Sequence, residues 1–253
     1  MALFRRLPVQ LSIVVPVRNE AENILPLLVE IHAALENIEA KPVEFEVVYV
    51  DDGSSDATPQ RLAEAMKRYP RLRVLAHRES CGQSTALLTG MRAARGEWVA
   101  TLDGDGQNDP ADIPKLLAAR DSARAATLWL IAGYRKTRRD TWLKRLSSRI
   151  ANAVRSNLLG DATPDTGCGL KLVARAAYLE LPFFDHMHRF LPALVQRNGG
   201  ATISVEVNHR PRTRGTSNYG LFDRLWVGIV DLVGVMWLKR RVRRPRVSER
   251  PRP

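Results

Sequence analysis

The chain of 253 residues, 45% apolar and 26% charged, is long enough to bury the core of one sizeable domain, and this composition excludes a largely disordered protein. Its two cysteines, Cys81 and Cys168, are too few for a disulfide framework or a thiolate metal site, which fits a reducing compartment. The net charge of +12 comes from two segments, 135–155 and 239–253, each with eight Lys or Arg against one acid, and it favours anionic lipid headgroups over a nucleic-acid groove.

Short β-branched runs alternate with amphipathic stretches through the first hundred residues. This alternation predicts right-handed βαβ units and an α/β fold with a mostly parallel sheet that carries helices on both faces. The expected strands are Leu11–Pro16, Phe45–Val50, Leu72–Ala76 and Glu97–Leu102, and the expected helices are Glu20–Ala40, Asp56–Arg68 and Gln83–Arg95.

The alternation becomes irregular after residue 110. A helix to about Arg124, a strand Leu128–Ala132 and a late strand Ala201–Val207 are expected. Between them, Trp142–Leu159 has the period of an amphipathic helix, with Arg149 and Arg155 among the basic residues opposite its apolar arc. A basic face against an apolar face with tryptophan is typical of a helix at a membrane interface.

The longest apolar stretch, Leu225–Leu238, has about fourteen residues and contains Asp231, so it is short of the roughly twenty that span a bilayer. We expect it to lie on a membrane. Residues Met1–Pro8 lack the apolar core of a secretory signal. The predicted organisation is a catalytic domain at 1–220 with the interface helix at about 142–159, a membrane-associated helix at 221–238 and a basic disordered tail at 239–253.

Two acidic clusters follow predicted strands. Asp51 and Asp52 end the second strand, and Asp103 and Asp105 follow the fourth, separated by a glycine. Ligands of parallel sheets bind beyond the carboxyl ends of the strands, where both clusters are expected. The second cluster can turn around a hard divalent cation that holds a diphosphate. Asp52 has an alternative interpretation, in which it caps the loop that follows it.

Three motifs in order resemble the signature of family-2 glycosyltransferases with the GT-A fold: Val14–Glu20, Asp51–Asp56, and Leu102–Asp105 followed by Gln107. Gln107, Asp165-Thr166-Gly167 and the loop Arg212-x-x-Gly215-x-Ser217-x-Tyr219 resemble the branch that loads a sugar onto polyprenyl phosphate, as dolichol-phosphate mannosyltransferases do. The resemblance covers about residues 10 to 238. The turn after Asp165 lacks the usual Ser, and Asn218 replaces a frequent Lys.

The resemblance implies a donor site for a nucleotide diphosphate sugar. By it, the nucleotide pocket is lined by Pro16, Arg18 and Glu20. Asp51 and Asp52 bind the base or ribose, and Asp103 faces ribose or metal. Asp105 and Gln107 ligate Mg²⁺ or Mn²⁺, which offsets the charge on the departing nucleotide.

The resemblance also implies an acceptor phosphate held by Arg135 and Arg149, while Arg212 and Ser217 close over the diphosphate. Such a phosphate is already anionic, so its attack on the anomeric carbon needs positioning rather than a general base. A transferase for a saccharide or lipid hydroxyl is the alternative, and Asp165 would then be the candidate base.

The function expected from these observations is an inverting, metal-dependent glycosyltransferase at the cytoplasmic face of the membrane, in envelope or lipid A modification. Its expected partners are the donor, polyprenyl phosphate and the membrane surface, with no nucleic acid. A homo-oligomer or a membrane-protein partner could complete membrane attachment. Two alternatives from other classes are a nucleic-acid-binding module, suggested by charge alone, and a nucleotide-sensing membrane adaptor without turnover.

Overall fold

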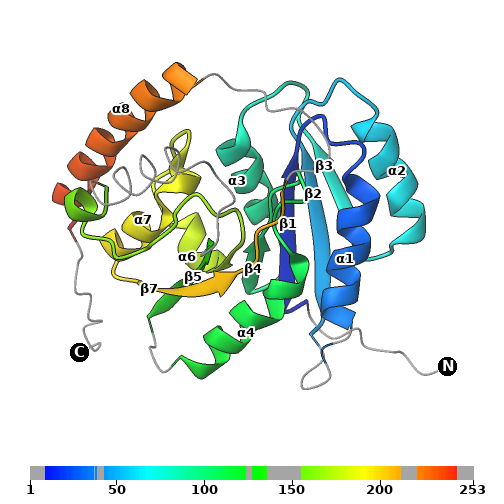
Figure 1. Ribbon diagram of the computed structural model, residues 1–253, viewed down its shortest axis with the longest axis horizontal. Helices are drawn as coiled ribbons and strands as arrows, with labels where there is room; N and C mark the ends of the chain where they lie inside the picture. Colours follow the sequence, from blue (N-terminus) through cyan, green and yellow to red (C-terminus); the bar gives the residue numbers. More distant parts are fainter. Residues whose placement is uncertain are drawn as a thin grey trace, which may run out of the picture.

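In a computed structural model, residues 9–36, 38, 43–123, 127–135, 155–211 and 221–243 are described (Figure 1). They contain a seven-stranded sheet in the order β3-β2-β1-β4-β6-β5-β7. The strands are β1 (Leu11–Val17), β2 (Phe45–Asp51), β3 (Leu72–Ala76), β4 (Trp98–Thr101), β5 (Leu128–Arg135), β6 (Lys171–Ala174) and β7 (Ala201–Val207). The predicted α/β class with a mostly parallel sheet is confirmed.

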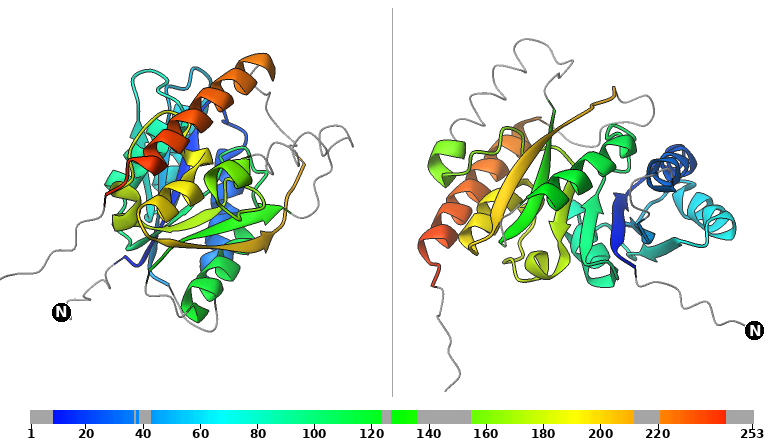
Figure 2. Two further views of the ribbon diagram at one scale, coloured as in Figure 1. Left: turned by 90° about the vertical axis from the view of Figure 1, so that its left-hand side faces the viewer. Right: turned by 90° about the horizontal axis from the view of Figure 1, so that it is seen from below.

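Helices cover both faces of this sheet (Figure 2). One core lies between the sheet and α1 (Ile24–Glu36), α2 (Thr58–Arg68), η1 (Pro110–Asp112) and α4 (Ile113–Ser122). The other lies beneath α3 (Gln83–Ala93), α6 (Arg175–Leu179), η2 (Met187–Arg189), α7 (Leu191–Arg197) and α8 (Leu221–Arg240). Because alternate residues of β1 face opposite cores, the strand is buried throughout, as its continuous apolar run predicts.

One strand was not predicted. The short strand β6 lies antiparallel between β4 and β5, pairing Val99 with Val173 and Ile131 with Leu172. Its direction brings the preceding turn, residues 165–170, to the edge at which the parallel strands end. The break in the alternation therefore supplies a second set of loops to that edge.

The segment predicted as an interface helix lies outside the described residues up to position 154, and residues 155–159 are helical. Within them, the prediction that Arg155 lies on an open basic face opposite the apolar arc is wrong. Its side chain is buried, and Nη1 donates to Asp161 Oδ2 at 2.5 Å while Nη2 donates to the Thr163 carbonyl at 2.8 Å. The nearby carboxylate makes the burial of this charge possible.

The last helix continues two residues beyond its predicted end and packs on α7. Val235 is buried, and Leu232, Met236 and Leu238 contact the core beneath it. Arg197 Nε donates to the Leu238 carbonyl at 3.0 Å, which ties the two helices together. Across the described part of the chain, every helix is too short or too polar to cross a membrane. The tail from residue 244 lies outside the described residues.

Candidate active site

The carboxyl edge of the sheet gathers most of the residues predicted to form a site. These are Arg18 and Glu20 after β1, Asp51 and Asp52 at the end of β2, Asp103–Gln107 after β4, Arg135 at the end of β5, and Asp165–Gly169 before β6. Pro16 is buried within β1, opposite Val50, whereas Arg18 is exposed. Arg149, Arg212 and Ser217 lie outside the described residues.

The loops after β1 and β2 are fastened to each other by hydrogen bonds. Asn19, whose φ of 56° is left-handed, donates its backbone N–H to Ser54 Oγ at 2.9 Å and accepts the N–H of Ser55 at 2.8 Å through Oδ1. The N–H of Glu20 donates to Thr58 Oγ1 at 2.9 Å. A cavity of about 460 Å³ lies at this corner, lined by Asn19, Glu20, Ala21, Glu22, Asn23, Asp56, Ala57 and Arg61.

The two adjacent carboxylates of β2 have different partners. Asp51 is buried and accepts the N–H of Ser54 at 3.0 Å, so it is Asp51 that caps the following loop. Asp52 turns toward the loop after β3, where its carboxylate accepts hydrogen bonds from His77, Ser80 and two backbone N–H groups. Burial raises the pKa of Asp52, but these hydrogen bonds outweigh it and leave the pKa below its ordinary value.

The loop after β4 is folded around its own carboxylates. Asp105 Oδ1 accepts the N–H of Gln107 at 3.1 Å, and the N–H of Asp103 donates to Asn108 Oδ1 at 3.1 Å. Gly104 lies so close to β1 that a Cβ there would be 2.4 Å from Val17 Cγ1. The loop is thus held at the centre of the edge with Asp103, Asp105 and Gln107 on one short segment.

Asp103 is the most perturbed acid of this loop. It is partly buried, and Gly169 lies so close that a Cβ at that position would be 2.2 Å from Asp103 Oδ2. Burial first, and the neighbouring charge of Asp105 second, raise the pKa of Asp103 to about 6, against the opposing charges of Lys171 and Arg135. A cation at this loop would restore the charged form, because it removes the penalty for two adjacent carboxylates.

This perturbation predicts that Asp103→Asn stabilises the fold at neutral pH when divalent metal is chelated. A raised folded-state pKa means that the folded protein loses stability as pH rises from about 4 to 6, where the unfolded carboxyl has already ionised. Asparagine removes that cost while keeping an oxygen for Gln83, which donates to Asp103 at 2.8 Å. We expect a gain of about 1 to 2 kcal/mol in the free energy of unfolding.

Urea unfolding of both proteins at neutral pH and near pH 4 measures this effect. The difference should shrink at the lower pH, because Asp103 is then protonated in the folded state and only about half ionised in the unfolded state. Equal free energies of unfolding for the two proteins at neutral pH would contradict the proposed cost of ionising Asp103 in the folded state.

Across the edge, Arg135 is clamped by Asp165. Its Nε donates to Asp165 Oδ2 at 2.6 Å and its Nη2 to Oδ1 at 3.0 Å, and the N–H of Gly167 donates to Oδ1 at 3.1 Å. Burial lowers the pKa of Arg135, but its bonds and charge interactions with Asp165 reverse this and raise it. The side chain is therefore a permanent cation in a fixed orientation beside Asp103.

Sequence reasoning missed Lys171 and Gln83 in this site. Lys171 is buried, its Nζ donates to the Cys168 carbonyl, and burial lowers its pKa. Lys171 is the first residue of β6, a strand that was not predicted, so the sequence did not indicate that it lies at the site. Gln83 stands at the predicted start of a helix, which indicates closeness to the strand ends but does not reveal its contact with Asp103.

The arrangement has two halves with distinct chemistry. Asp103, Asp105 and Gln107 supply the oxygen ligands that hard divalent cations prefer, so this loop fits Mg²⁺ or Mn²⁺. Arg135 supplies a fixed guanidinium that suits phosphate oxygens. A cation-binding loop and an anion-binding side chain therefore lie next to each other at the edge where ligands of such sheets bind.

The chain matches the family model described as glycosyl transferase family 2 over residues 12–181. It is 36% identical over 246 residues to dodecaprenyl-phosphate galacturonate synthase of Rhizobium johnstonii, covering 93% of this chain and 69% of the relative. It is 34% identical over 212 residues to undecaprenyl-phosphate 4-deoxy-4-formamido-L-arabinose transferase of Edwardsiella ictaluri, covering 83% and 63%. The chain thus spans about two thirds of the length of these curated relatives.

Solved structures share the fold. The mannosyltransferase PcManGT from Pyrobaculum calidifontis, in complex with GDP-Man and Mn²⁺, superimposes with a TM-score of 0.62 at 22% identity, covering 95% of this chain and 67% of that one. Glucosyl-3-phosphoglycerate synthase from Mycobacterium tuberculosis, with Mn²⁺, UDP-glucose and glycerol 3-phosphate, gives a TM-score of 0.60 at 18% identity, covering 91% and 79%.

Proposed function

This chain belongs to glycosyl transferase family 2, and we propose that it transfers a sugar from a nucleotide diphosphate sugar to polyprenyl phosphate. The names of the relatives support a polyprenyl-phosphate acceptor. The observation that carries the proposal is the position of the Arg135 guanidinium beside the loop of Asp103 and Asp105, because it puts an anion-binding group next to a cation-binding one.

On the donor side, we propose that Asp51 meets the base or ribose with Pro16, Arg18 and Glu20 around it. The family motifs imply the same role for Asp52, but its carboxylate already accepts four hydrogen bonds from the loop after β3 and the start of α3, so we leave it out of the donor pocket. Asp105 and Gln107, with Asp103, would hold Mg²⁺ or Mn²⁺ against the diphosphate. When bound, the cation stabilises the negative charge on the departing nucleotide. The protein contributes a loop already folded by the bonds to Gln107 and Asn108, so little reorganisation is needed on binding.

On the acceptor side, Arg135 would bind phosphate oxygens, together with Arg149, while Arg212 and Ser217 close over the donor. A phosphate oxygen attacks the anomeric carbon as the bond from that carbon to the diphosphate oxygen breaks. One displacement of this kind inverts the configuration. It requires no proton transfer from the attacking group, which is ionised near neutral pH.

The environment of Asp165 favours this acceptor over a hydroxyl group. A hydroxyl acceptor needs a base, and Asp165 was the candidate. Its carboxylate accepts two hydrogen bonds from the guanidinium of Arg135 and one each from the backbone N–H groups of Arg135 and Gly167. A carboxylate whose oxygens accept these bonds is well suited to orient the guanidinium, and these bonds compete with any approach of a substrate hydroxyl.

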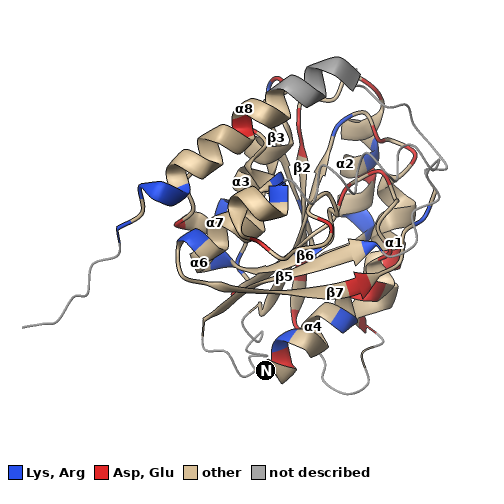
Figure 3. Ribbon diagram, turned by 60° about the vertical axis from the view of Figure 1, so that its left-hand side comes forward, with Lys and Arg blue, Asp and Glu red and all other residues tan. Residues whose placement is uncertain are grey.

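We propose that α8 is the membrane contact. Its outward stripe consists of Ile229, Val230, Val233 and Trp237, which are 45%, 55%, 60% and 57% exposed. Basic residues lie at the C-terminal end of α8 (Figure 3), which finishes with Lys239 and Arg240. The guanidinium of the following Arg241 lies 5.8 Å from the centroid of the Trp237 ring. An apolar stripe that ends in basic residues suits a surface of acyl chains and anionic headgroups. We place this surface at the cytoplasmic face, a reducing compartment that suits two free cysteines.

Replacing Val233 and Trp237 together by serine should weaken binding to vesicles of anionic phospholipid by about a hundredfold, because both side chains would leave the acyl boundary. Vesicle co-sedimentation measures the partition coefficient. The matched control is Val29→Ser with Met66→Ser, since these exposed apolar side chains lie on α1 and α2, on the other side of the sheet. Equal partitioning of the two double variants would exclude α8 as the contact.

The test of the proposed reaction is transfer of labelled sugar from a panel of UDP- and GDP-sugars to undecaprenyl phosphate in detergent with Mg²⁺ or Mn²⁺. A lipid product from one donor that disappears on chelation supports the proposal and identifies the sugar. Transfer to a saccharide or lipid hydroxyl, with no lipid-phosphate product from any donor, would refute it.

A further inference from the structure

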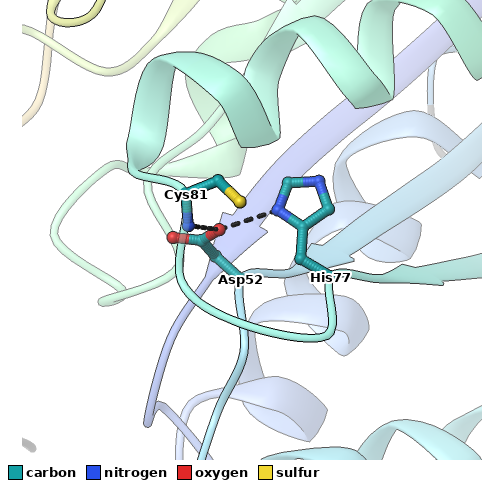
Figure 4. Close-up of side chains that lie close together, drawn as sticks. All are labelled: Asp52, His77 and Cys81. Carbon is teal, nitrogen blue, oxygen red and sulfur yellow. Dashed lines mark hydrogen bonds and ion pairs between the residues drawn. The ribbon is translucent and has the colours of Figure 1, made fainter.

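A second group of side chains of metal-ligand type, on the loops after β2 and β3, has no member in common with the loop of Asp103 and Asp105. The ligand atoms of Asp52, His77 and Cys81 all lie within 4.8 Å of one another. Figure 4 shows the Cys81 thiol and the His77 ring turned toward the Asp52 carboxylate. Asp52 is buried, His77 is partly buried, and Cys81 is exposed, so the cluster is closed on the protein side and open toward solvent.

Backbone packing fixes this cluster before any ligand arrives. Gly53, with a φ of +67°, lies against the loop after β3, and a Cβ there would be 2.6 Å from Glu79 C and Ser80 N. Only glycine lets the two loops approach so closely. The carboxylate of Asp52 then holds the loop by accepting the N–H of Cys81 at 2.8 Å and that of Gly82 at 2.9 Å. The backbone N–H of Cys81 is thus hydrogen-bonded to the Asp52 carboxylate, and the Cys81 thiol lies beside the same carboxylate.

His77 is oriented from both sides of its ring. Nδ1 lies 2.7 Å from Asp52 Oδ1, and Nε2 lies 2.9 Å from Thr89 Oγ1 on α3. Without metal, Nδ1–H donates to Asp52 while the hydroxyl of Thr89 donates to Nε2. With a metal on Nδ1, the proton resides on Nε2 and donates to Thr89. A partner of this kind on the second nitrogen is typical of metal-bound histidine.

We propose that Asp52, His77 and Cys81 form a site for a borderline-soft divalent transition metal, Zn²⁺ in particular, separate from the site for the transfer cation. Imidazole, carboxylate and thiolate are the three ligand types that Zn²⁺ uses, whereas Mg²⁺ and Mn²⁺ prefer oxygen. The two cysteines are too few for a site built from thiolates alone, but a mixed set needs only one. On binding, the Cys81 thiol releases one proton to solvent and the His77 proton moves from Nδ1 to Nε2. The carboxylate and thiolate then balance the charge of the ion, and solvent completes a tetrahedral shell.

The site would stiffen the loop that leads into the donor pocket. Asp51 immediately precedes Asp52, and Gln83, two residues after Cys81, contacts Asp103. A metal that ties His77 and Cys81 to Asp52 would therefore fix the start of α3 relative to the cation-binding loop. Binding at this cluster does not depend on the proposed transfer reaction.

The test uses the full chain, stripped of metal by a chelator and then titrated with Co²⁺ as a spectroscopic substitute for Zn²⁺. A thiolate ligand produces a charge-transfer band in the near ultraviolet, and Zn²⁺ should abolish it by displacing Co²⁺. We expect one such site per chain. Cys81→Ser should remove the band and weaken Zn²⁺ binding about tenfold or more, and Thr89→Val should weaken it about tenfold with the band retained.

Two controls separate this site from the transfer cation and from misfolding. Asp105→Asn should keep the band, since the loop after β4 is not part of the cluster. Thermal unfolding in chelator should be the same for Cys81→Ser and the unmodified chain, because the thiol is exposed. A band that survives Cys81→Ser, or its absence from the folded unmodified chain, would overturn the proposal. Either result would leave the transfer assay unaffected, so the two proposals fail independently.

Discussion

Asp105→Asn is expected to lower kcat/KM for sugar transfer by about a thousandfold, because it removes a charged oxygen from the loop that would hold the cation. After burial, which is the larger cause, the nearby charge of Asp105 also raises the pKa of Asp103. A bound cation would remove this repulsion. The measurement is transfer to polyprenyl phosphate over a range of Mn²⁺ concentrations, which separates weaker metal binding from slower chemistry.

The control for this variant is Asp109→Asn on the same loop. The Asp109 carboxylate is occupied by Arg210, at 2.6 Å, and by the N–H of Ala111. Its loss should reduce thermal stability while leaving the dependence on Mn²⁺ within about threefold of the unmodified chain. If both variants lost activity equally, the defect would lie in the shape of the loop and not in a metal ligand.

Arg135→Lys is expected to lower kcat/KM for the lipid acceptor by about a hundredfold while donor binding remains unchanged. Lysine keeps the positive charge and can still pair with Asp165, so the fold should survive. It cannot offer two parallel N–H donors to Asp165 and also present others to a phosphate. The measurements are the KM for polyprenyl phosphate and the affinity for the nucleotide, the latter by calorimetry.

Arg155→Lys is the matched control, since Arg155 makes a buried pair with Asp161 of the same kind. It should cost stability but leave the KM for the lipid within a few-fold of the unmodified value. An Arg135→Lys enzyme with an unchanged acceptor KM would assign Arg135 to structure alone.

The fold was largely predictable because its strands are short, buried and rich in β-branched residues. β1 and β2 are apolar along almost their whole length, as strands covered on both faces must be. β6 escaped prediction for physical reasons. It has only four residues, it begins with Lys171, and its pairing with β4 joins residues some seventy positions apart. A segment of this kind is too short to show the alternation of apolar and polar residues from which strands are predicted.

The candidate site was predictable as a set of motifs but not as a set of contacts. The positions of Asp51, Asp103 and Asp105 follow from the rule that parallel strands end at one edge. The four hydrogen bonds to Asp52 do not follow from that rule. They depend on how closely Gly53 lets the loop after β3 approach. The burial of Arg155 was equally hidden, since helical period alone does not tell whether a neighbouring acid will neutralise a charge.

The insertion of β6 between β4 and β5 constrains the order in which the protein can assemble. β1 to β4 form a contiguous parallel block from the first 101 residues, which can pair as soon as they leave the ribosome. β5 is synthesised next, yet it is linked to β4 only through β6, so it cannot join the block before β6 has been made. About forty residues of chain must therefore emerge while β5 waits, with the apolar edge of β4 uncovered. Chaperone demand should peak in that interval of synthesis, and a chain stalled there would aggregate more readily than one stalled at β4 or β7.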